Sequence, residues 1–191
     1  MPTSGAITYD NFDISKNPTQ WKKMLGYVPQ EVFILDNSIK NNIAVEFSDE
    51  KIDLDKLENA IKFSNCEEFI NKLAEGKDTQ VGERGIKLSG GQRQRIGIAR
   101  ALYNEPDIIL FDEATSSLDS KNEREIVKSI VGLRKNKTLI CISHKISNLR
   151  NMDKIIVLKE GEIDKIGSAN EIIEYLNLID KEEIENSKNK I

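Results

Sequence analysis

Long apolar runs, cysteine pairs and a marked excess of either charge are all missing from this sequence of 191 residues. Its longest apolar stretches, such as 108–111 and 155–158, fall far short of the roughly 18 to 20 residues that cross a bilayer, which predicts no membrane span. Two cysteines, Cys66 and Cys141, suggest neither a disulfide framework nor a zinc site, so we expect both to be reduced packing residues. A net charge of −4 argues against nonspecific binding to nucleic acid, which depends on clustered Lys and Arg.

The length and composition of the sequence suit one ordinary folded domain. Apolar residues make up 38% of the sequence and charged residues 31%, which suits a hydrophobic core beneath a polar surface. The N-terminal residues lack the basic and apolar regions of a secretory signal, so the cytosol is the expected compartment. Only residues 180–191 form a dense charged segment, which we expect to be a solvated helix or a frayed tail.

Two helical patterns follow short extended pieces, 5–9 and 25–28, in the first half of the chain. One helix is expected over about 53–63, with Asp53 as its N-terminal cap. A second is expected to begin at Ser64, because Glu67 stands three residues later, as in a capping box.

Strands and helices alternate in the second half. A helix over about 91–103 precedes the apolar run 108–111, which is typical of a strand that is buried on both faces. The remaining expected elements are a helix capped by Ser120 and Glu123, a strand over 138–143, and a hairpin that pairs 155–158 with 162–166 across Gly161. This alternation predicts an α/β domain with a parallel sheet.

Leu88-Ser89-Gly90-Gly91-Gln92, the segment before the 91–103 helix, suits a phosphate-binding turn. Two glycines remove the Cβ atoms that would keep a bulky anion from the backbone, and Ser89 adds a hydroxyl donor. The helix N-terminus supplies unpaired N–H groups and a partial positive charge. The same residues would also suit an ordinary turn before a helix, and by themselves they leave both interpretations open.

Acidic side chains follow the buried strand, at Asp112 and Glu113. Ligands of open α/β sheets lie beyond the carboxyl ends of the strands, so both carboxylates are expected where a ligand would bind. One can hold Mg²⁺, and the other can orient and deprotonate an attacking water. Standing alone, the pair would be read as an acidic N-cap.

Two further side chains follow expected strands. His144, the single histidine of the chain, comes after the 138–143 strand, where a neutral imidazole could donate a hydrogen bond to a transferring phosphate. Gln30 follows the 25–28 segment. Taken alone, a single histidine is more often structural, and a glutamine after proline is a turn residue.

Taken together, the motifs resemble the nucleotide-binding domain of ATP-binding-cassette (ABC) transporters, in order and in spacing. The resemblance covers about residues 2–170, and the segment 80–85 looks like the exporter branch, in which this loop contacts the membrane half. It implies a partial P-loop NTPase (RecA-like) parallel sheet with an inserted α-helical signature subdomain. The matching motifs are Tyr27-Val28-Pro29-Gln30, Leu88 to Gln92, Ile108 to Glu113, Ser117-Leu118-Asp119 and Ser143-His144.

The resemblance implies a role for each matching residue, with ATP and Mg²⁺ as cofactors. Ser89, Gly90, Gly91 and Gln92 would form the signature that closes over ATP bound to the opposite protomer. Asp112 would be the Walker B aspartate for Mg²⁺ and Glu113 the general base. Gln30 would be the Q-loop glutamine, which senses Mg²⁺ and the γ-phosphate and couples to the membrane domain. Asp119 would cross the dimer interface, and His144 would be the switch histidine at the γ-phosphate.

One motif of the family is missing. The pattern G-x-x-x-x-G-K-[ST] occurs nowhere, and the single Gly-Lys pair, Gly76-Lys77, is followed by Asp78. The resemblance places the start of this chain just downstream of the P-loop helix, without the adenine-stacking aromatic residue. Because P-loop donors hold the β- and γ-phosphates, we expect weak ATP binding by this chain alone and a composite site with a partner that brings a P-loop. Loss of an inner strand should also expose apolar sheet and lower solubility.

The resulting hypothesis is the ATPase domain of an exporter, residues 1–170, with a helical signature subdomain at about 40–100 and a charged C-terminal helix or tail at 171–191. Its expected partners are a second nucleotide-binding domain in a head-to-tail dimer and a transmembrane domain, on the cytoplasmic side of a membrane. A noncatalytic remnant or regulatory module that supplies only the signature half is the alternative. A DNA-repair or chromosome-organising ATPase is disfavoured because heptad segments are absent.

Overall fold

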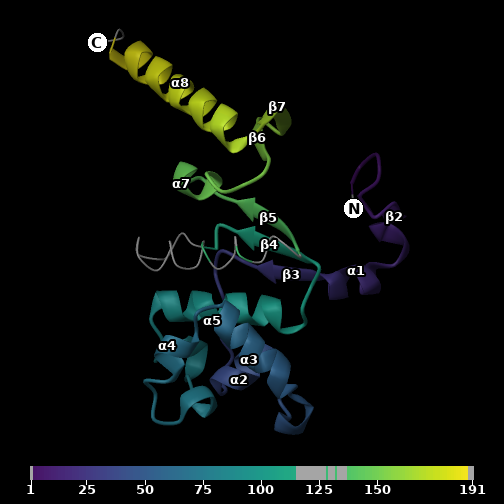
Figure 1. The fold of residues 1–191 in the computed structure, drawn as a ribbon, viewed down its shortest axis with the longest axis vertical. Helices are drawn as coiled ribbons and strands as arrows, with labels where there is room; N and C mark the ends of the chain where they lie inside the picture. The colour runs from purple at the N-terminus through teal and green to yellow at the C-terminus, as the bar shows by residue number, and fades with distance from the viewer. Residues whose placement is uncertain (1, 115–127, 129–131, 133–136, 189–191) are drawn as a thin grey trace. The chain divides into compact units, whose positions relative to one another are not determined.

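The computed structural model of this chain describes residues 2–114, 128, 132 and 137–188 (Figure 1). The chain forms two compact units, Met1–Ile142 and Ser143–Ile191. Among the described residues, no helix is both long enough and apolar enough to cross a membrane.

A parallel sheet in the order β3-β4-β5 forms the centre of the first unit. Its strands are β3 (Leu25–Val28), β4 (Ile108–Asp112) and β5 (Thr138–Ile142). Phe111 in the middle strand lies opposite Val28 on one side and Cys141 on the other. The carboxyl ends of the three strands therefore meet at one edge, as the parallel α/β prediction requires.

The first unit also contains several helices and the short hairpin of β1 (Thr8–Tyr9) and β2 (Phe12–Asp13). The α-helices are α1 (Pro18–Met24), α2 (Ile39–Ala44), α3 (Leu54–Phe63), α4 (Glu67–Ile70) and α5 (Gly90–Tyr103). Short 3-10 turns are η1 (Ile14–Lys16), η2 (Asp49–Lys51), η3 (Gly76–Asp78) and η4 (Glu83–Gly85).

Helix α5 packs against one face of the sheet (Figure 1). Val28, Ile109 and Phe111 are buried on this face, in a cluster that includes apolar side chains of α5. Gly26 permits the close approach, because a Cβ at that position would lie 2.5 Å from the carbonyl oxygen of Ala101 in the helix. The core therefore fixes β3 and β4 relative to the helix that begins at the predicted signature.

The opposite face of the sheet carries exposed apolar side chains. Tyr27, Leu110 and Ile140 stand in one row across the three strands. Tyr27 is 49% exposed, Ile140 47% and Ile142 48%, and β5 is the last strand of the sheet within the described residues. These exposures agree with the expectation that apolar sheet would be uncovered, and low solubility stays a prediction.

Helix α3 begins as predicted, whereas the expected helix start at Ser64 is wrong. Asp53 caps α3 by accepting a hydrogen bond from the Lys56 N–H. Ser64 instead ends α3, with its hydroxyl donating to the Ile61 carbonyl at 3.1 Å. Asn65 then turns left-handed, at a φ of 55°, so the next helix, α4, starts only at Glu67 and has no capping box.

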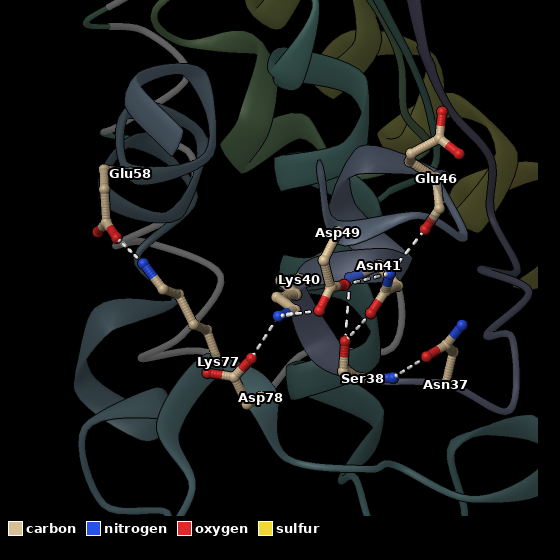
Figure 2. A network of polar contacts seen from close by, with 9 residues as sticks. All are labelled: Asn37, Ser38, Lys40, Asn41, Glu46, Asp49, Glu58, Lys77 and Asp78. Atoms are coloured by element: carbon tan, nitrogen blue, oxygen red, sulfur yellow. Dashed lines mark hydrogen bonds and ion pairs between the residues drawn. The ribbon is translucent and has the colours of Figure 1, made fainter. Parts of the chain in front are cut away.

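A polar network ties the short turns to the helices around them (Figure 2). The ammonium group of Lys40 lies 2.7 Å from Asp49 Oδ2 and 2.6 Å from Asp78 Oδ1, so α2 is joined to both η2 and η3. Lys77 forms an ion pair with Glu58 of α3. The single Gly-Lys pair of the chain, Gly76-Lys77, therefore lies in η3, where Lys77 makes a structural ion pair.

The second unit holds α7 (Ile146–Leu149), the antiparallel pair β6 (Ile155–Lys159) and β7 (Glu162–Gly167), and α8 (Ala169–Lys188). The hairpin turns at Gly161, which has a φ of 83°, as predicted. The second unit has a small core of its own, in which Ile155, Ala169 and Ile172 are buried. Helix α8 includes most of the segment that the sequence assigned to a charged helix or tail.

Both cysteines carry free thiols, as expected. Cys66 is buried, and burial raises its pKa to about 12. Cys141 is partly buried, and burial raises its pKa to about 11. Both thiols are therefore protonated near neutral pH, as suits packing residues.

Candidate active site

Asp112 and Glu113, which we call the acidic pair, lie where β4 ends. Asp112 is the last residue of the strand, and the Glu113 N–H donates to the Ile142 carbonyl of β5 at 3.1 Å. Glu113 adopts a φ of 48°, in the left-handed region that costs a residue with a side chain about 1–2 kcal/mol. The chain thus leaves the sheet through a strained position at the predicted site, and such strain often accompanies function.

Two side chains of the β3 segment hold the acidic pair. Gln30 Nε2 donates to Glu113 Oε2 at 2.9 Å, and the Tyr27 hydroxyl donates to Asp112 Oδ2 at 3.0 Å. The structure therefore brings together three residues that the sequence predicts for the site. Tyr27 appears in one of the family motifs, but sequence reasoning gave it no role.

The contact with Asp112 also affects the Tyr27 phenol. Its pKa is raised, first because the hydroxyl donates to Asp112, then through partial burial and the negative charge of that carboxylate. The proton stays on the phenol, so Tyr27 acts as a donor throughout the physiological range. Asp112 accordingly has a hydrogen-bonded oxygen, Oδ2, and a second oxygen, Oδ1, on the same carboxylate.

The signature turn, Leu88–Gln92, leads into α5 through a capping box. Ser89 Oγ accepts from the Gln92 N–H at 3.2 Å, and Gln92 Oε1 accepts from the Ser89 N–H at 2.8 Å. Because Ser89 Oγ is an acceptor here, its own O–H remains able to donate. A Cβ placed on Gly90 would find no atom closer than 3.9 Å, so this side of the turn is open to a ligand.

Arg93 adds a positive charge beside the signature turn, and sequence reasoning missed it. Its Nη1 donates to the Leu88 carbonyl at 2.7 Å, while its Nη2 is the atom 3.9 Å from the hypothetical Gly90 Cβ. The first turn of α5 contains no acidic residue to offset this charge or the helix dipole. The turn therefore presents a positive environment that suits an anion.

Helix α5 also links the signature turn to the acidic pair. Gln94, two residues after the turn, donates from Nε2 to the Pro29 carbonyl at 3.4 Å. Pro29 directly precedes Gln30, which contacts Glu113. One short path of contacts therefore runs from the start of α5 to the end of β4.

Two predicted site residues, His144 and Asp119, are not placed beside the acidic pair by the structure. His144 follows β5 but belongs to the second unit, where its side chain is exposed, so its approach to the acidic pair stays a prediction. Asp119, with Ser117 and Leu118, lies outside the described residues, as do the expected caps Ser120 and Glu123.

The acidic pair fits Mg²⁺ by the chemistry of its donors. Carboxylate and amide oxygens are hard ligands, and Mg²⁺ is usually held by one or two carboxylates together with substrate phosphates. Among the described residues, no group of three or more His, Cys, Asp or Glu side chains could form a complete metal cage. Asp112 is thus suited to a shared site that other ligands complete.

A parallel sheet, an acidic pair at the end of its central strand and a glycine turn at a helix N-terminus are features of α/β nucleotide-binding domains. Comparison with known proteins specifies the family: the family model described as "ABC transporter" matches residues 1–116. This chain belongs to the ABC transporter family, and its similarities indicate the nucleotide-binding domain of an exporter.

Similar proteins come from distant organisms. ABC transporter B family member 1 of Dictyostelium discoideum is 38% identical over 187 residues, which cover 95% of this chain and 20% of that protein. A putative export ATP-binding/permease protein of Rickettsia felis is 42% identical over 170 residues, which cover 88% of this chain and 29% of that protein. The chain therefore spans less than a third of the length of these relatives.

A solved structure shows the same fold. The structure of a bacterial Atm1-family ABC exporter with ATP bound aligns with a TM-score of 0.83 at 36% sequence identity. The alignment covers 92% of this chain and 31% of that chain. The predicted fold class, a parallel α/β sheet of the ABC nucleotide-binding type, is therefore confirmed.

Proposed function

We propose that this chain contributes the signature turn and the acidic pair to ATP binding and hydrolysis that drive export across a membrane. The observation that carries the proposal is the hydrogen bond between Gln30 and Glu113, which joins the ends of β3 and β4. Family membership and the ATP-bound exporter with the same fold support the nucleotide.

The acidic pair would divide the chemistry between two carboxylates. Glu113 would accept a proton from the attacking water, and the Gln30 amide that donates to its Oε2 would hold the carboxylate in place. Asp112 would hold Mg²⁺, which neutralises phosphate charge when it is bound. His144 would donate a hydrogen bond to the transferring phosphate.

The signature turn would bind the phosphates of a nucleotide held by another protomer. The backbone N–H groups at the start of α5, the Ser89 hydroxyl and the Arg93 guanidinium together offer donors and positive charge on the open side of Gly90. In that arrangement the P-loop of the partner would supply the donors to the β- and γ-phosphates. The expected assembly is a head-to-tail dimer with a second nucleotide-binding domain.

A transmembrane domain is the second proposed partner, which would place this chain at the cytoplasmic side of a membrane. Support comes from two exposed apolar residues, Phe33 at 64% and Ile86 at 82%. They flank a tight contact in which a Cβ on Gly85 would lie 3.0 Å from Ile34 Cγ2. This contact joins the segment after Gln30 to the segment 80–85 that resembles exporters.

Phosphate release tests the proposal. The chain would be mixed with the P-loop-containing nucleotide-binding domain of the Rickettsia felis relative, and release from MgATP would be compared with that of each component alone. We expect stimulation by the wild-type chain and by Glu67→Gln, a control in α4, but none by Glu113→Gln. The alternative is a noncatalytic module that supplies only the signature half of a dimer site. Equal release with wild type and Glu113→Gln would support that alternative and contradict hydrolysis at Glu113.

A further inference from the structure

Tyr27 is placed by the sheet to act on Asp112. In the parallel register, Tyr27 lies opposite Leu110, and Asp112 is two residues further along β4. Alternate residues of a strand share one face, so Tyr27 and Asp112 project from the same side of the sheet. The phenol crosses from β3 to β4 and reaches Oδ2 at 3.0 Å.

This hydrogen bond restricts the orientation of the Asp112 carboxylate. Within the described part of the chain, Asp112 accepts from Tyr27 and from no other hydrogen-bond donor. The bond uses Oδ2 and leaves Oδ1 to a cation. A carboxylate held through one oxygen has fewer orientations to lose when the other oxygen binds a metal.

Gln30 and Tyr27 act on neighbouring carboxylates from the same segment. Tyr27 of β3 bonds Asp112, and Gln30, two residues after that strand, bonds Glu113, so each carboxylate of the acidic pair is held by one side chain of this segment. The ring of Tyr27 is about half exposed and shares its row with Leu110 and Ile140. Phenylalanine would keep this ring and lose only the hydroxyl, which makes the contact separable from the packing.

The geometry points to Tyr27 as a positioning residue that orients Asp112 for a divalent cation. This inference rests on the proposed function, in which Asp112 holds Mg²⁺. In this role Tyr27 acts through the carboxylate to which its hydroxyl donates. Partners of this kind, which hold a metal-binding side chain, change metal affinity by about 10- to 100-fold when they are removed.

Binding of Mn²⁺ alone to the full chain, measured by electron paramagnetic resonance, tests the inference without any turnover. Mn²⁺ prefers the same oxygen ligands as Mg²⁺. Tyr175→Phe is the matched control, because the Tyr175 hydroxyl donates to Asp164 Oδ2 at 2.7 Å within the second unit, and neither residue is one of the proposed site residues. Circular dichroism of each variant shows whether the fold is retained.

We expect Asp112→Asn to abolish the site, Tyr27→Phe to weaken it about tenfold, and Tyr175→Phe to bind as wild type does. Equal or tighter binding by Tyr27→Phe, with binding lost in Asp112→Asn, would overturn the role of Tyr27 and leave the proposed function standing. Wild-type binding by Asp112→Asn, or no binding by the wild-type chain, would overturn the metal role of Asp112 itself.

Discussion

Gly26 is the position where the packing behind the site can be tested most sharply. A Cβ added there would lie 2.5 Å from the Ala101 carbonyl oxygen and 2.8 Å from Pro106 Cγ. Ordinary contacts begin near 3.4 Å, so β3 would have to move away from α5 by almost 1 Å. The carbonyl belongs to the helix backbone and cannot rotate aside as a side chain could.

Gly26→Ala should therefore destabilise the first unit by about 2–3 kcal/mol, the upper part of the range for overpacking. Urea unfolding followed by circular dichroism would show a lower midpoint with an unchanged slope. Gly90→Ala is the control, because its Cβ meets no atom closer than 3.9 Å and alanine favours a helix; it should change stability by less than about 1 kcal/mol. A wild-type midpoint for Gly26→Ala would refute the packing argument.

Two other perturbations test separate parts of the structure. Lys40→Met should lower the free energy of unfolding by about 1 kcal/mol, and by less in high salt, because Lys40 is mostly buried while Asp49 and Asp78 are exposed. Lys72→Met removes an ion pair with Glu68 in which both side chains are exposed, so it should lower the free energy of unfolding by less than about 0.5 kcal/mol. Urea unfolding measures both effects. Burial raises the pKa of the Cys66 thiol to about 12, above its value of about 9 in the unfolded chain. The contribution of this thiol to the stability of the folded chain should therefore be fully present below about pH 9 and be lost as the pH rises toward 12. Iodoacetamide should accordingly label Cys66 at least about 100-fold more slowly in the folded than in the urea-unfolded chain at neutral pH, and equal rates would contradict its burial.

Local sequence patterns predicted the parts of the fold that depend on neighbouring residues. The apolar run of β4, the Asp53 cap and the Gly161 hairpin all follow from side chains close together in the chain. Ser64 misled the same reasoning, because the left-handed turn at Asn65 ends one helix where the capping pattern predicted the start of another.

Long-range contacts of the site were harder to predict. Tyr27 and Asp112 are 85 positions apart, and their bond depends on the register of β3 against β4, which no local pattern fixes. Arg93 reads as an ordinary helix residue until its guanidinium is seen beside Gly90. Glu113 was predicted from its place after a buried strand, whereas Gln30 was assigned to the same site only through the resemblance to a family.

Assembly with ATP tests most directly whether the signature turn of this chain serves a nucleotide held by a partner. Sedimentation velocity of Glu113→Gln mixed with a P-loop-containing nucleotide-binding domain should show a heterodimer with MgATP and separate monomers without it. Adding Gly90→Asp should abolish that heterodimer, because a carboxylate on the open side of the turn would repel the phosphates. Association that is the same with and without ATP, or that survives Gly90→Asp unchanged, would contradict the account.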